Sequence, residues 1–175
     1  MKKLSLLFTL MVTILTCASV RAQVTPAQLA QEWQRAKAYT KTYLDAMPDD
    51  GYSFKPTAEV RTFAGQMFHL ADANYVFAST VGGKPNPLGK SSLEKATDQS
   101  KAATTKAVMD SYDFVITIIQ GMTPAQLNET IKFAGKDLSK ELILFKAFEH
   151  QTHHRGQTTI YLRLKGVTPP PDMLF

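Results

Sequence analysis

The four histidines of this chain occupy only two segments, and both segments have the residue pattern of a helix. His150, His153 and His154 lie within FEHQTHHRGQTTIY, and His69 lies far upstream in FAGQMFHLADANYVF. Residues four apart share one face of an α-helix, so His150 and His154 can both reach a point about 2 Å from their ring nitrogens. That distance is the usual metal–nitrogen separation. A fold that packs the two segments together would therefore create a site from histidines.

One interpretation of this arrangement is a divalent metal ion held by His69, His150 and His154. His153 is turned by about 100° from His154 around the helix axis, so it can share the site only by leaning toward it. Whether His153 replaces His154 as a ligand is left open by the spacing. The alternative interpretation is a solvated histidine cluster next to Arg155, because a pair of histidines four residues apart usually binds no metal.

Residues 1–22 have the pattern of a cleavable signal peptide. Two lysines precede an apolar stretch at residues 4–18, and a small-residue cleavage site lies just before Gln23. The apolar stretch is short for a membrane span and is followed by polar sequence, so we expect no stable membrane span after cleavage. The mature chain, residues 23–175, is then expected to be exported, either periplasmic or secreted.

Removal of the signal changes the charge and the cysteine content. Residues 1–22 carry three cations and no anion, so the formal net charge falls from +5 to +2. No run of Lys and Arg remains that is typical of a nucleic-acid surface, and we expect no nucleic-acid partner. The only cysteine, Cys17, also leaves, so the mature chain has neither a disulfide nor a cysteine nucleophile. A lipoprotein anchored through Cys17 is the less favoured alternative, because Thr16 stands where a smaller residue is preferred.

Apolar residues recur at helical spacing in four long stretches of the mature chain. The helices are predicted at 26–47, at about 57–80, from Ser91 or Ser92 to 121, and at 137–165. A short helical turn at 124–127 and a small strand at 130–133 are expected before the last helix. With no convincing sheet, the pattern predicts an all-α four-helix bundle that forms one domain over residues 23–175.

One face of the last predicted helix continues the line of the histidines in both directions. This face carries Ile143, Ala147, His150, His154, Gln157, Tyr161 and Leu164. A metal ion on that line would lie in the interior of the bundle.

Two longer motifs resemble the DinB/YfiT-like family of metalloenzymes. One is HHRGQTTIYLRLKGVTPP near the C-terminus, and the other is MPDDGYSFKPTAEVRTFAGQMFHLADANYVF. The resemblance covers nearly the whole mature chain. It implies a four-helix bundle with a divalent metal bound by His69 of the second helix and by the pair His150 and His154 of the last. It also implies that His153 lies beside the ligands and that the protein pairs as a homodimer through helix faces. The better-known relatives are cytoplasmic enzymes that use low-molecular-weight thiols, and the export signal distinguishes this chain from them.

Polar residues near the histidines are candidates to support the ligands. They are Gln157, Tyr161, Asp72 and Glu149, and the alternative for each is an ordinary polar residue on a helix. Arg155 and Gly156 belong to the C-terminal motif. We expect Arg155 to make a structural hydrogen bond and Gly156 to allow close helix packing.

Three neutral imidazoles leave a metal ion with open positions for water or substrate. Such an ion acts as a Lewis acid or lowers the pKa of bound water or thiol. Nitrogen ligands favour zinc or nickel here, with manganese or iron as alternatives. The sequence therefore predicts a metal-dependent hydrolase, or a thiol or group transferase, acting on a small molecule that it does not identify. The alternative is a non-catalytic periplasmic bundle that binds a metal or another ligand.

Other metalloproteins are excluded by spacing. A zincin peptidase needs HExxH, whereas Glu149 lies outside the histidine pair here. A di-iron bundle needs paired Glu-x-x-His helices, and covalent c-type haem needs CxxCH, and both patterns are absent from the sequence.

Overall fold

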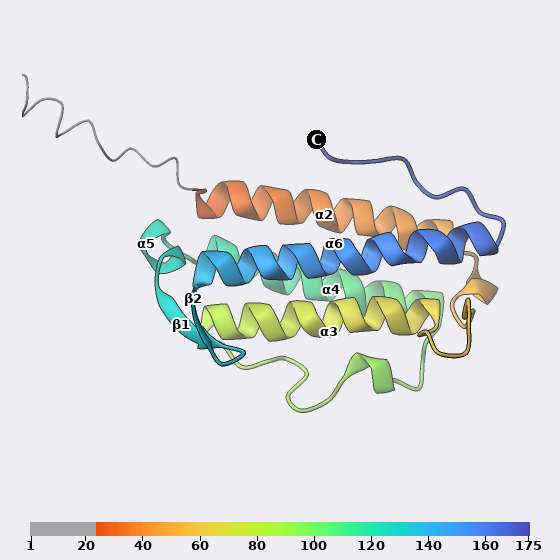
Figure 1. Ribbon diagram of the computed structural model, residues 1–175, viewed down its shortest axis with the longest axis horizontal. Helices are drawn as coiled ribbons and strands as arrows, with labels where there is room; N and C mark the ends of the chain where they lie inside the picture. The colour runs from red at the N-terminus through yellow and green to blue at the C-terminus, as the bar shows by residue number, and fades with distance from the viewer. Residues whose placement is uncertain (1–23) are drawn as a thin grey trace, which may run out of the picture.

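The structure is a computed structural model that describes residues 24–175. Four long helices form the body of the protein (Figure 1). They are α2 (Pro26–Ala46), α3 (Phe63–Gly82), α4 (Lys101–Gln120) and α6 (Lys140–Leu164). The shorter elements are η1 (Asp49–Gly51), η2 (Leu93–Lys95), α5 (Pro124–Leu127), β1 (Thr130–Phe133) and β2 (Lys136–Ser139). The predicted signal peptide and Cys17 lie outside the described residues. No helix in the described part of the chain is long and apolar enough to cross a membrane.

The order of the helices around the bundle differs from their order along the chain. Helix α3 packs against α4 and α6, and α2 packs against the same two helices, so α2 and α3 occupy opposite corners (Figure 1). Large side chains fill the space between the helices, among them the fully buried Trp33, Phe63 and Tyr112. The predicted helical bundle is confirmed, and its topology places the helix of His69 directly beside the helix of His150 and His154.

The first helix begins where the sequence predicted it. The Thr25 side chain accepts a hydrogen bond from the Gln28 backbone N–H, and the Gln28 side-chain oxygen accepts one from the Thr25 backbone N–H. This capping box satisfies two backbone donors that a helix start leaves free. Pro26 at the first helical position adds a fixed φ that suits the helix.

The second helix begins later than predicted, at Phe63 instead of about residue 57. Its cap is Thr62, whose hydroxyl accepts a hydrogen bond from the Gly65 N–H at 2.9 Å. The backbone N–H groups of Phe63 and Ala64 donate to the carbonyls of residues 54 and 52, at 3.0 Å each. Because those partners come from the preceding loop and not from an earlier helical turn, residues 57–62 stay non-helical and form one wall of a cleft described below.

The third helix also begins later than predicted. Ser92 accepts a hydrogen bond from the Glu94 N–H, but the helix it starts is only the short η2. The long helix α4 starts at Lys101, with Ser100 as its cap. Ser92 and the start of η2 are tied to Asp72 of α3, and this tertiary contact overrides the local preference for a longer helix.

The predicted strand at Thr130–Phe133 is confirmed. Its partner strand was not predicted, because residues from 137 onward were expected to belong to the last helix. Strand β2 pairs antiparallel with β1, so α6 begins at Lys140 and not at residue 137. The chain turns through Ala134 and Gly135, whose φ angles are 49° and 77°. Ser139 then caps α6 by accepting the Leu142 N–H at 3.2 Å.

The buried face of α6 differs in part from the predicted one. Leu164 is 58% exposed and is not a core residue. Gly156 is also exposed, and a Cβ placed there would meet no atom of another described element within 4 Å. Gly156 therefore does not allow a close helix approach. Arg155 is buried as expected of a structural residue, with its guanidinium 2.9 Å from Gln151 Oε1 and 4.3 Å from the centre of the Tyr39 ring.

Candidate metal centre

The fold brings together His69, His150 and His154, the three histidines that the sequence predicted as metal ligands. His69 comes from α3 and the other two from α6. Each residue offers one ring nitrogen, and these nitrogens all lie within 4.8 Å of one another. The ring centres are 4.3 Å apart for His150 and His154, 4.5 Å for His69 and His154, and 5.2 Å for His69 and His150.

A carboxylate orients His69. Glu94, in η2, places Oε1 2.7 Å from His69 Nδ1. Its other oxygen, Oε2, accepts a hydrogen bond from Arg61 Nε at 2.7 Å. The Arg61 Nη2 atom also lies 3.2 Å from His69 Nδ1. Burial acts to raise the pKa of the Glu94 carboxyl, but the hydrogen bonds and charges of Arg61 and His69 outweigh burial and lower that pKa.

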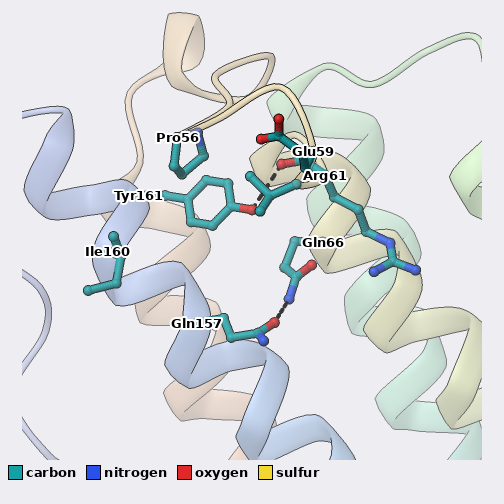
Figure 2. Close-up of a pocket in the computed structure, with 8 residues that line it drawn as sticks. Pro56, Glu59, Arg61, Gln66, Gln157, Ile160 and Tyr161 are labelled. Carbon is teal, nitrogen blue, oxygen red and sulfur yellow. Dashed lines mark hydrogen bonds between the residues drawn. The ribbon is translucent and has the colours of Figure 1, made fainter.

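Two glutamine side chains surround His154. Gln66, one helical turn before His69 on α3, places Nε2 2.7 Å from His154 Nδ1, and Gln157 places Oε1 3.2 Å from the same atom. The two amides also bond to each other, Gln66 Nε2 donating to Gln157 Oε1 (Figure 2). Gln157 Oε1 can accept a proton from Nδ1 of His154, whereas Gln66 Nε2 can only donate to that atom.

His150 has a buried nitrogen that lacks a partner. Its Nδ1 atom has no hydrogen-bond partner among residues 24–175. A buried polar atom without a partner costs free energy, and functional sites are one reason for such an atom to persist. The ring of Phe77, 6.1 Å from the His150 ring centre, closes the neighbouring side of the site.

His150 and His154 are held in the neutral form. Burial, and then the charges of His69, His153 and Arg61, lower the pKa of His150 from 6.5 to about 4. Burial, and then the same kind of repulsion from the neighbouring histidines, lowers the pKa of His154 to about 3. Neutral imidazoles have the lone pair that a metal ion requires, so these two rings need no deprotonation before binding at pH 7.

These observations fit a divalent metal ion. A metal ion about 2.0–2.1 Å from each nitrogen needs the nitrogens about 3–4 Å apart, which small side-chain rotations achieve from the present spacing. The donors are all imidazole nitrogens, and the sequence-based expectation of zinc or nickel is based on that donor set. The chemistry of the donors and the unsatisfied Nδ1 of His150 both agree with a bound ion.

The centre lies at the edge of the bundle, which corrects the prediction of an interior site. The His69 side chain is 27% exposed and His150 is partly exposed, although His154 is buried. Besides α6, the neighbour of α3 at His69 is the short η2, through Glu94, and not another long helix. Solvent therefore reaches the His69 and His150 side chains.

A cleft of about 680 Å³ lies between α3, α6 and the loop before α3 (Figure 2). It is lined by Pro56, Glu59, Val60, Arg61, Gln66, Gln157, Ile160 and Tyr161. Gln66 and Gln157 belong both to the cleft wall and to the surroundings of His154, so these two amides lie between the cleft and His154 Nδ1. Tyr161 supports the wall by donating its hydroxyl to the Arg61 carbonyl at 2.9 Å.

The polar residues predicted around the histidines have mixed outcomes. Gln157 contacts His154, and its Nε2 lies 3.0 Å from Nε2 of the exposed His153. Tyr161 lies in the cleft wall and supports the loop instead of a histidine. Asp72 holds the segment around η2, and Glu149 pairs with Lys146 on the surface.

Sequence reasoning missed Gln66, Glu94 and Arg61. Gln66 precedes His69 by three residues, so the helical period alone could have placed both side chains on one face. Glu94 and Arg61 lie in segments without helical periodicity, and no spacing in the sequence relates them to His69.

Comparisons with known proteins agree with this architecture. A model of the DinB family matches residues 17–174 of the chain. The YjoA protein of Bacillus subtilis is 24% identical over 148 residues, covering 82% of this chain and 93% of YjoA. A DinB-like protein of Bacillus cereus superposes with a TM-score of 0.74 at 23% identity, covering 83% of this chain and 96% of that one.

A third relative is the YfiT protein of Bacillus subtilis. It superposes with a TM-score of 0.63 at 15% identity, covering 85% of this chain and 93% of YfiT. YfiT is described as a probable metal-dependent hydrolase with an unusual four-helix bundle topology. At these identities the two structural likenesses establish the fold, and the family match covers nearly the whole chain.

Proposed function

Because this chain belongs to the DinB family, we propose that it is a metal-dependent enzyme, a hydrolase or a thiol or group transferase. His69, His150 and His154 are its metal ligands. The observation that carries the proposal is the set of three imidazole nitrogens within 4.8 Å of one another. A cleft lies close by, and its wall shares Gln66 and Gln157 with the surroundings of His154. The description of YfiT as a probable metal-dependent hydrolase supports the hydrolytic alternative.

A divalent ion at this position supplies Lewis acidity and lowers the pKa of a bound water or thiol. The chain's own residues position the substrate. Ligand sites of about 300–1,000 Å³ are typical of small molecules, and the adjoining cleft is within that range. Val60 and Ile160 offer apolar surface there, while the amides of Gln66 and Gln157 offer hydrogen bonds close to His154.

Metal-dependent turnover tests the proposal. Residues 23–175, stripped with a chelator and reloaded with zinc, nickel, manganese or iron, would be assayed for hydrolysis of esters, amides and phosphate esters and for transfer of small thiols. We expect at least one activity that requires the added metal and that His154→Ala abolishes. His153→Ala is the matched control, because His153 is exposed on the same helix and lies outside the group of three.

Metal binding without turnover on the full panel would contradict the enzymatic proposal. It would favour the alternative of a non-catalytic bundle that binds a metal or another ligand.

Export and pairing are part of the same proposal. The pattern of residues 1–22 supports a cleaved signal peptide, and N-terminal sequencing of the protein from periplasmic and culture fractions tests it. An N-terminus at Gln23 is the expected result. A lipid-modified Cys17 in the membrane fraction would instead support the lipoprotein alternative. The family resemblance supports a homodimer, which light scattering of the purified protein tests.

A further inference from the structure

The segment between α3 and α4 is fastened to α3 next to His69. Asp72 accepts hydrogen bonds from the Ser92 hydroxyl at 2.6 Å and from the Leu93 N–H at 2.9 Å. It also accepts the Glu94 N–H at 3.4 Å. Asp72 lies three residues after His69 on the same helix, so the two side chains are neighbours on its surface. The anchor that holds this segment therefore lies one turn from the histidine that the segment contacts.

The Glu94 carboxylate is engaged at both oxygens. Oε1 contacts His69 Nδ1 at 2.7 Å, and Oε2 accepts from Arg61 Nε at 2.7 Å. The Glu94 side chain is 31% exposed, so water does not fully screen these contacts. With both oxygens committed, Glu94 is placed to orient a neighbour and not to bind a metal ion itself.

A carboxylate facing Nδ1 determines which ring nitrogen of His69 carries the proton. An ionised carboxylate only accepts hydrogen bonds, so the 2.7 Å contact places a proton on Nδ1. Arg61 Nη2, at the longer distance of 3.2 Å from the same nitrogen, then makes no hydrogen bond to it and its charge is met by Glu94. In the neutral ring, Nε2 then carries the lone pair. That atom is the one available for a metal ion, and the hydrogen bond also limits rotation of the ring.

We infer that Glu94, anchored by Asp72 and Arg61, is the positioning residue that holds His69 with its Nε2 lone pair directed toward the shared site. The expected effect on metal affinity rests on the proposed metal-binding function. The position of the proton on His69 Nδ1 does not, and it can be measured in the protein without metal. Hydrogen-bonding partners of metal-ligating histidines typically change metal affinity by about 10- to 100-fold when they are removed.

The first test is made without metal. Nitrogen-15 NMR of histidine-labelled residues 23–175, in chelator and at a pH above the ordinary histidine pKa, distinguishes a protonated Nδ1 from a protonated Nε2. We expect His69 to carry its proton on Nδ1 in the parent protein and to show a mixture of the two forms in Glu94→Ala. A parent His69 protonated on Nε2 would overturn the inference whether or not the protein binds metal.

The second test is metal affinity, measured by competition between the protein and a chromophoric zinc chelator. Glu94→Ala should weaken zinc binding by about 10- to 100-fold, and Glu94→Gln, which keeps an accepting oxygen, should weaken it less. The control is Glu149→Gln, which removes a negative charge near the same histidines from a residue that pairs with Lys146. The control separates a hydrogen-bond effect from a general loss of negative charge.

Equal affinities for the parent, Glu94→Ala and Glu149→Gln would overturn the inference, and so would equal losses in the Glu94 and Glu149 variants. Circular dichroism confirms that each variant keeps its helices. A parent protein that binds no zinc at all would instead contradict the proposed function, while the NMR result would still decide how His69 is held.

Discussion

At the residue scale, His150 and His154 are bases that the folded protein keeps uncharged. Burial is the largest cause, and it lowers the pKa of His150 from 6.5 to about 4 and that of His154 to about 3. In the unfolded chain both rings take up protons near their ordinary pKa. Between those two ranges the unfolded state therefore binds more protons than the folded state.

This difference predicts acid sensitivity of the metal-free protein. Its free energy of unfolding should be flat above the ordinary pKa of 6.5 and should fall as the pH drops toward about 4. Urea unfolding in chelator across this range measures the slope. The variant His150→Ala/His154→Ala should show a shallower slope. Equal slopes for the two proteins would mean that these histidines are protonated in the folded state.

Gln151 satisfies two buried groups at once. Its Oε1 accepts hydrogen bonds from the Tyr112 hydroxyl at 2.8 Å and from the Arg155 guanidinium at 2.9 Å. Gln151→Leu should lower the free energy of unfolding by about 2–4 kcal/mol, because it leaves a buried cation and a hydroxyl without this acceptor. Chemical denaturation measures the loss. The control is Gln34→Leu on the exposed surface of α2, which should change the free energy of unfolding by no more than about 0.5 kcal/mol. An equally small change for Gln151→Leu would show that Arg155 finds another partner.

The site could be predicted from the sequence only where a helical period relates its residues. His150 and His154 are four apart on one helix, and His69 was joined to them by the scarcity of histidine and by the family resemblance. Glu94 reaches His69 through a turn held by Asp72, and such a tertiary arrangement has no period in the sequence. Asp72 lies near His69 in sequence, so the sequence predicted that it supports the ligands directly. In the structure it holds the segment of Glu94, and Glu94 is the residue that contacts His69.

At the element scale, a capping residue in the sequence predicted the start of a long helix correctly only where no distant side chain bound the cap or the backbone after it. Thr25 begins α2 as expected, and Ser92 caps only η2. Asp72 binds the Ser92 hydroxyl and two following N–H groups, so the chain there follows α3 and does not continue as a helix. Helix periodicity predicted the four long elements, but their boundaries depended on such contacts.

The hairpin before α6 contains an unfavourable residue. Ala134 has a φ of 49°, in the left-handed region that disfavours alanine, and Gly135 follows with a φ of 77°. Asn-Gly is strongly preferred in two-residue hairpin turns of this kind. Ala134→Asn should therefore raise the free energy of unfolding by about 0.5–1 kcal/mol, measured by thermal and chemical denaturation. Gly135→Ala should have the opposite sign, and a stabilising Gly135→Ala would contradict this account of the turn.

At the scale of the whole molecule, the histidine site joins two neighbouring helices that are far apart in sequence. An ion bound by His69 of α3 and by two histidines of α6 would bind the folded protein and not the unfolded chain. At a free zinc concentration of about 100 Kd, the gain is about 2.7 kcal/mol, or roughly 5–10 °C in melting temperature for a domain of this size. Differential scanning calorimetry measures it. His154→Ala should remove the shift, and an equal shift in that variant would place the bound zinc elsewhere.

The most direct test of the central claim is the metal content of residues 23–175 purified without a histidine tag. We predict about one zinc or nickel ion per chain by elemental analysis, as for a single three-histidine site. His69→Ala and His150→Ala/His154→Ala should both lose it while their helical circular dichroism persists. A parent protein that holds no metal after supplementation with zinc, nickel, manganese and iron would contradict the claim, and so would variants that keep their metal.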